Sequence, residues 1–183
     1  MKYLKRLPHL SIVSEAIFAA TENIASEYRH RYIGTEHLLL ALVRTPGSLA
    51  HDLLIIDGVT PDTVSALLEK VLQSNTESLK KKQFWDAIKF RRFSLYRIIP
   101  DFLIFPKHIP TNRLTKVISS AKTIQTRLQH KCLTTQNLLC AILESKGVIA
   151  HKLIEELSND ISRLSKKVNH PLFILLTERK ECV

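Results

Sequence analysis

The sequence predicts an all-α protein that uses one four-helix unit twice. The first observation is an internal repeat, because IGTEHLLLAL at residues 33–42 returns one hundred positions later as LTTQNLLCAI at residues 133–142. Aligned without gaps, residues 16–56 and 116–156 share ten identities in 41 positions. The second observation is the spacing of apolar residues at intervals of three and four, which is typical of amphipathic helices. Such a repeat indicates one supersecondary unit present in two copies.

The first two helices of the first copy are predicted from their caps and breaks. Ser11 is the expected N-cap of an amphipathic helix. Gly34 breaks this helix from the next, for which Thr35 is the expected N-cap and Glu36 a favourable acid in the first turn. Residues 38–43 are all apolar. We therefore expect this short helix in the middle of a bundle.

The remaining two helices of the first copy follow from similar signals. Residues 48–56 form the third helix, and Gly58 stands where a left-handed C-terminal residue is needed. Thr60, followed by a proline at the first helical position, opens the fourth.

The second copy repeats this plan. Thr111 is the expected cap of its first helix and Thr135 that of its apolar helix. Asn159 or Asp160 opens the last helix, which ends near residue 168. The predicted divisions are a first repeat at 1–72, a joining insert at 73–110, a second repeat at 111–169 and a C-terminal tail at 170–183.

Composition and charge narrow the class of protein. The chain has 183 residues, 45% hydrophobic content and a net charge of +10. Seven basic residues and one acid between positions 79 and 97 supply six of these positive charges, so the insert carries most of the basic character. No apolar run reaches the ~18 residues of a membrane span, and the start lacks the apolar region of a secretory signal. We expect a cytoplasmic protein, or a stromal one in a plastid-bearing host.

The three cysteines fit neither a zinc nor a redox spacing. Cys132, Cys140 and Cys182 are odd in number, and we expect all three to be free thiols.

The repeated stretch points to a known family. IGTEHLLLAL, with His30 before it, Ala50 after it and a second copy downstream, resembles the Clp N-terminal domain of the Clp unfoldases, and in particular its ClpC-like branch. This resemblance covers residues 11–72 strongly and 111–168 more weakly. It implies two four-helix repeats related by pseudo-twofold symmetry and packed as one bundle. The chain has no Gly-x-x-x-x-Gly-Lys run, so we expect an accessory protein without AAA+ modules.

The resemblance also implies a binding site. In ClpC-like relatives the glutamate of this motif binds the guanidinium of phosphorylated arginine, with the phosphate held near helix N-termini. The chemistry is sound, because a carboxylate pairs with a guanidinium in fork geometry and backbone N–H groups accept an anion. The alternative is that the threonine and glutamate only start a helix. Carried over, the site consists of Glu36, Thr35 and Ser11, with Gln136, Thr135 and Thr111 as a degenerate second site.

Catalytic and metal sites are not expected. His30 and His51 recur as His130 and His151, but no second ligand stands at a metal-binding spacing, so we expect capping or packing roles. No nucleophile motif occurs. The sequence therefore predicts a protein that is not an enzyme and that needs no cofactor.

The insert is rich in aromatic and basic residues and is open to three interpretations. Its aromatic side chains fold back onto the bundle, or they form an exposed docking surface, or they meet an acidic partner such as nucleic acid or a membrane. The residues proposed for partner binding are Trp85, Phe90, Arg91, Arg92, Phe93, Tyr96 and Arg97.

These observations predict a binding function. We expect a non-catalytic accessory or adaptor protein of a Clp chaperone-protease system, whose partners are a Clp ATPase, a Clp protease ring or their protein substrates. The alternative is a binder of nucleic acid or of an anionic membrane surface that acts through the basic insert.

Overall fold

The computed structural model describes residues 9–70 and 109–182, and within these ranges the protein is helical apart from two short strands. The all-α prediction is confirmed. The elements are α1 (Ile12–Glu27), β1 (Tyr32–Ile33), α2 (Thr35–Arg44), α3 (Leu49–Ile56), a helix over residues 61–70, β2 (Ile109–Pro110), α5 (Asn112–Arg127), α6 (Thr135–Glu144), α7 (Ile149–Leu157), α8 (Ile161–Val168) and α9 (Pro171–Glu181).

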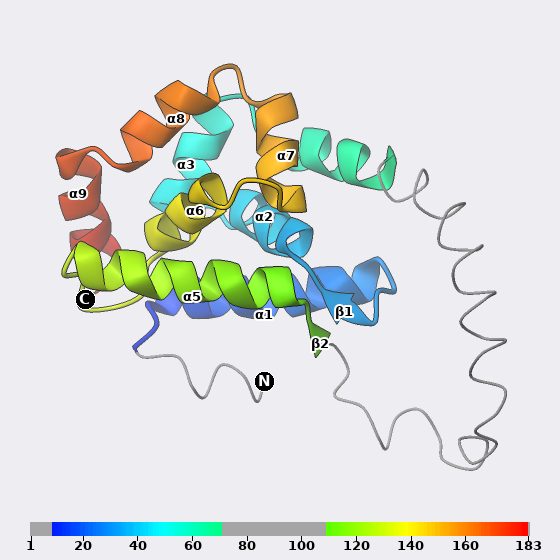
Figure 1. Cartoon of the computed structure of the whole chain (residues 1–183), viewed down its shortest axis with the longest axis horizontal. Coiled ribbons are helices and arrows are strands. Elements are labelled where there is room, and N and C mark those ends of the chain that lie inside the picture. The colour runs from blue at the N-terminus through cyan, green and yellow to red at the C-terminus, as the bar shows by residue number, and fades with distance from the viewer. Residues whose placement is uncertain (1–8, 71–108, 183) are drawn as a thin grey trace, which may run out of the picture.

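The two short apolar helices form the centre of the molecule. α2 packs against α1 of its own repeat and against α7 of the other repeat, while α6 packs against α5 and crosses to α3. The long helices α1 and α5 lie along one side of this centre, and α3, α7 and α8 lie on the other (Figure 1). Leu38 to Leu42 and Leu138 to Ile142 are at most 1% exposed. The apolar helices are therefore central, as their composition predicts.

The two repeats exchange short extended segments. Ile33 in β1 pairs in parallel with Pro110 in β2, and Leu10 forms a parallel bridge with Leu133. Positions 10 and 110, like 33 and 133, are one hundred residues apart, so the two pairings are equivalent by the pseudo-twofold symmetry. Each pairing places the residue before the N-cap of one repeat's long helix beside the residue before the N-cap of the other repeat's central helix.

The helix caps are confirmed for the long helices and corrected for the central ones. The Oγ atoms of Ser11 and Thr111 accept backbone N–H groups of α1 and α5, as N-caps do. The caps predicted at Thr35 and Thr135 are wrong by one position, because the N-caps are the preceding Gly34 and Thr134. The pairing just before these residues keeps their backbone extended, with φ of −107° and −98°.

Two features of the C-terminal region differ from the predictions. The predicted C-terminal tail at 170–183 contains a further helix, α9, with Pro171 at its first turn. Cys132 and Cys182 form a disulfide with their Cα atoms 5.8 Å apart, so the prediction of three free thiols is wrong. Because α9 folds back onto the loop before α6, it joins two cysteines separated by 50 positions. Cys140 is a free, buried thiol whose pKa burial raises to about 12.

Among the described residues, no single helix is long and apolar enough to cross a membrane. The pair α2 and α3 meets the length and composition criteria jointly, with a bend of 91° between them. The partner-binding residues proposed between Trp85 and Arg97 lie outside the described residues.

Candidate functional site

A pocket of about 330 Å³ opens where the N-terminus of α2 meets the N-terminus of α5. We call it the α2 site. It draws on both repeats because the pairing of β1 with β2 brings these two helix starts together. Its lining consists of Tyr32, Thr35, Glu36, Thr111, Asn112, Arg113 and Ile149.

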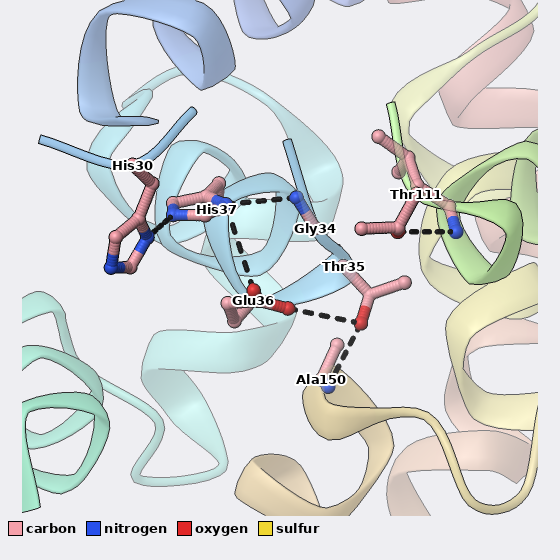
Figure 2. Close-up of polar contacts among 8 residues, drawn as sticks. His30, Gly34, Thr35, Glu36, His37, Thr111 and Ala150 are labelled. Carbon is pink, nitrogen blue, oxygen red and sulfur yellow. Dashed lines mark hydrogen bonds and ion pairs between the residues drawn. The ribbon is translucent and has the colours of Figure 1, made fainter. Parts of the chain in front are cut away.

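Glu36 provides the acid of the α2 site. Its side chain is nearly buried, and its Oε2 accepts a hydrogen bond from Thr35 Oγ1 at 3.5 Å (Figure 2). The carboxylate lies over Gly34 so closely that a Cβ atom added to this glycine would overlap it. Burial raises the pKa of Glu36, while its own backbone N–H, Thr35 and the positive charge of Arg113 act in the opposite direction. The site therefore holds a desolvated carboxyl group opposite an exposed guanidinium.

A chain of hydrogen bonds fixes the start of α2 beside Glu36. Gly34 N–H donates to His37 Nδ1 at 2.9 Å, so the proton of a neutral His37 lies on Nε2. His37 Nε2 then donates to His30 Nδ1 at 2.7 Å (Figure 2). The ring of Tyr32 stacks on His30 with centroids 4.9 Å apart, and burial lowers the pKa of His30. These histidines cap and pack, which agrees with the structural role predicted for His30.

The second repeat builds the same arrangement with an amide. Thr134 N–H donates to Asn137 Oδ1 at 2.9 Å, and Asn137 Nδ2 donates to His130 Nδ1 at 3.1 Å. Asn137 thus takes the place of His37 in both hydrogen bonds. The exchange of histidine for asparagine preserves the hydrogen bonds at the helix start. The exchange of Glu36 for Gln136 replaces an ionisable carboxyl group with a neutral amide.

The corresponding position at the N-terminus of α6, which we call the α6 site, is filled by the chain itself. Thr135 donates from its backbone N–H to Glu181 Oε2 at 2.8 Å and from its Oγ1 to Glu181 Oε1 at 2.6 Å. Ser11 Oγ lies 3.4 Å from the same carboxylate. Gln136 donates its Nε2 to the Val168 carbonyl of α8, and its buried Oε1 has no hydrogen-bond partner within residues 9–70 and 109–182.

The structure groups the predicted site residues differently from the sequence analysis. Ser11 was assigned to the site of Thr35 and Glu36, yet it contacts Glu181 in the α6 site. Thr111 was assigned to the second site, yet it lines the α2 site. The physical reason is the exchange of extended segments, which brings the first helix of each repeat to the central helix of the other. Whether these residues bind a ligand stays a prediction.

Sequence reasoning missed Tyr32, Asn112, Arg113 and Glu181. The two polar residues that follow Thr111 carried a signal, because they stand in the first turn of a predicted helix whose cap was already a candidate. Glu181 carried none, since no helix was assigned to its segment. In the described ranges, no group of three or more histidine, cysteine or acidic side chains is placed to hold a metal ion.

Comparison with known proteins places this geometry in context. Residues 11–84 match the family model described as Clp repeat (R) N-terminal domain. The chain is 24% identical over 144 residues to a probable ATP-dependent Clp protease ATP-binding subunit of Chlamydia pneumoniae, an alignment covering 79% of this chain. It is 22% identical over 155 residues to the ATP-dependent Clp protease ATP-binding subunit ClpC of Staphylococcus epidermidis, covering 85% of this chain. The aligned regions make up only 14% and 16% of these relatives.

Solved structures share the fold. The N-terminal domain of the caseinolytic protease associated chaperone ClpD from Arabidopsis thaliana superposes with a TM-score of 0.59 at 11% identity, covering 92% of this chain and 95% of that chain. A structure described as preliminary structural investigations of a malarial protein secretion system gives a TM-score of 0.55 at 15% identity, covering 90% and 98%.

Proposed function

We propose that this chain, whose residues 11–84 match the model of the Clp repeat N-terminal domain, acts as a non-catalytic accessory or adaptor protein of a Clp chaperone-protease system. The curated relatives are named as ATP-binding subunits of the Clp protease, which supports a partner from the same system. The resemblance to the Clp N-terminal domain implies a recognition platform, which supports binding without turnover. The cytoplasmic or stromal location stays a prediction.

The observation that carries this proposal is the presence of an acid and a base in the lining of the α2 site. Glu36 offers a desolvated carboxylate, and Arg113 offers an exposed guanidinium within electrostatic reach of it. A phosphorylated arginine presents the complementary pair, a guanidinium attached to a phosphate. We expect Glu36 to bind the guanidinium, and Arg113 with Thr111 at the start of α5 to bind the phosphate.

A calorimetric titration with free phosphoarginine tests the ligand. The wild-type chain should bind it, and Glu36→Ala should weaken the affinity at least tenfold because the charge-assisted hydrogen bonds are lost. Gln136→Ala is the matched control in the α6 site and should leave the affinity unchanged. Equal binding by wild type and Glu36→Ala would remove Glu36 from the site and leave it as a residue that starts a helix.

Affinity purification from the native host tests the partner. A Clp ATPase or protease subunit should be recovered with the wild-type chain. Recovery of nucleic acid or anionic lipid in its place, lost when the basic residues between Lys80 and Arg97 are neutralised, would favour the alternative function. Binding to a phosphate backbone or a charged surface would weaken steeply with added salt.

A further inference from the structure

The C-terminal helix α9 closes the α6 site with a side chain that behaves as a ligand. Glu181 is 4% exposed, and each of its carboxylate oxygens accepts a hydrogen bond from Thr135. Ser11, the cap of α1, lies within hydrogen-bond distance of the same group. A carboxylate held by a backbone N–H and two hydroxyl groups at a helix N-terminus is an occupied oxyanion site.

The pseudo-equivalent α2 site shows what the α6 site would be without this side chain. There Thr35 Oγ1 is directed to Glu36 of its own helix and to the Ala150 N–H, and a pocket remains open in front of the helix. In the α6 site, Gln136 replaces the acid and turns toward α8. Since Gln136 is neutral, it does not repel an anion beside Thr135, which explains why the carboxylate of Glu181 can occupy the α6 site.

The rest of α9 makes a smaller contact with the bundle. Only Thr177 and Glu181 of this helix are buried, while Leu172, Leu175 and Leu176 are 63%, 57% and 52% exposed. Phe173 packs partly buried against the hydrophobic core and supplies apolar contact near the start of the helix. The polar attachment lies at the C-terminal end, where Glu181 enters the site.

A covalent bond stands next to this attachment. Cys182 follows Glu181 directly and forms its disulfide with Cys132, three positions before Thr135. The bond thus holds both sides of the Glu181 contact together. Cys182 also lines an open surface pocket of about 380 Å³ with Lys131 and Leu175, so this end of the disulfide lies beside solvent.

We propose that the α6 site is a latent oxyanion-binding site that Glu181 closes and the Cys132–Cys182 disulfide locks. A dithiol reductant opens the lock by thiol–disulfide exchange: its two thiols give two electrons and two protons to Cys132 and Cys182, and it becomes a disulfide itself. Glu181 then leaves with α9. Thr135 and Ser11 become available to a carboxylate or a phosphate from another molecule, independently of any ligand in the α2 site.

Amide NMR of the full-length chain tests this proposal. In the oxidised protein the Thr135 amide should exchange slowly with solvent, and reduction with dithiothreitol should speed this exchange at least tenfold. The Leu38 amide, which donates to the Gly34 carbonyl in the first repeat, serves as an internal reference and should not change. No change at Thr135, or an equal loss of protection at Leu38, would overturn the proposal, because the disulfide would then be irrelevant to the site or required for the whole fold.

Titration with inorganic phosphate and with acetate, each at constant ionic strength with chloride, tests the site itself. The Thr135 amide should shift saturably in the reduced protein and in the oxidised Glu181→Ala variant, and it should not shift in the oxidised wild type. Glu178→Ala is the matched control on the same helix and should behave as the wild type. Saturation by phosphate or by acetate identifies the preferred oxyanion. Equal shifts in all forms, or none in any, would overturn the proposal while leaving phosphoarginine binding at Glu36 untouched.

Discussion

Replacing Gly34 with alanine should displace the carboxylate of Glu36, because the new methyl group would occupy the space where that carboxylate lies. The backbone itself accepts the change, since the φ of Gly34 is −107° and suits any residue. The strain therefore falls on the end of the Glu36 side chain. The second repeat shows the alternative outcome, since Thr134 stands at the equivalent position and Gln136 turns toward α8.

The cost to stability follows from the same geometry. Overpacking of one methyl group typically costs about 1–3 kcal/mol. A glycine-to-alanine change also lowers the conformational entropy of the unfolded chain, which stabilises the fold by roughly 0.4–1 kcal/mol. The overlapping atoms are the flexible end of a side chain, so we expect a net loss of about 1 kcal/mol. For a chain of this size, that corresponds to a fall in melting temperature of about 2–4 °C.

Two measurements with one control decide the outcome. Thermal unfolding gives the stability, and an NMR titration of the Glu36 carboxyl group reports whether its raised pKa falls toward the ordinary value of 4.5. Gly47→Ala is the control, because it introduces strain at a φ of +88° with nothing within 4 Å of the added Cβ atom. It should lower stability without changing the titration of Glu36. Wild-type values of both stability and titration in Gly34→Ala would show that the carboxylate of Glu36 does not occupy the space beside Gly34.

Three further predictions concern the sites and the disulfide. Burial raises the pKa of Glu36 in the folded state, so the ionised group lowers the stability of the fold at neutral pH. Glu36→Gln should therefore have the larger unfolding free energy in urea at pH 7. This gain should vanish as the pH falls below about 4.5, where the carboxyl group is protonated in both states. Thr111→Ala and Ser11→Ala should each lower stability by about 1 kcal/mol, because each removes a helix cap. Only Thr111→Ala should weaken phosphoarginine binding in calorimetry, since only Thr111 lines the α2 site. Equal weakening by both variants would contradict the assignment of Ser11 to the α6 site. The Cys132–Cys182 disulfide joins residues 50 positions apart. Its reduction should lower the unfolding free energy in guanidinium by up to about 4 kcal/mol. A change well below 1 kcal/mol would argue that the bond does not form in solution.

The sequence was sufficient to predict the fold because its strongest signals are local. The apolar run after Glu36 can be accommodated only in a buried helix. Ser11 and Thr111 predict helix starts because their hydroxyl groups cap the helix through local hydrogen bonds, which need no tertiary contact. The caps of the central helices were misplaced by one residue because a long-range strand pairing, with Ile33 as one partner, keeps the backbone extended there. Such pairings leave no mark in the periodicity of a single segment.

The candidate site was predicted only in part for the same reason. Its acid could be identified from the repeated motif, but its composition depends on which helix of the other repeat faces it. Arg113 and Thr111 enter the α2 site through the pairing of Pro110, one to three residues before them. The role of Glu181 depends on a disulfide between distant cysteines, and spacing alone does not reveal such a bond.

The exchange of extended segments means that one copy of the repeat on its own contains half of each site. Two identical copies would complete two identical sites only by associating around a true twofold axis. Because both copies lie in one chain, the two sites need not carry the same residues. The α2 site carries an acid, Glu36, and is open, whereas the α6 site is neutral at Gln136 and is filled by an acid from outside the repeat, Glu181. A single chain can therefore present one open site and one closed site, which a symmetric dimer of identical repeats cannot.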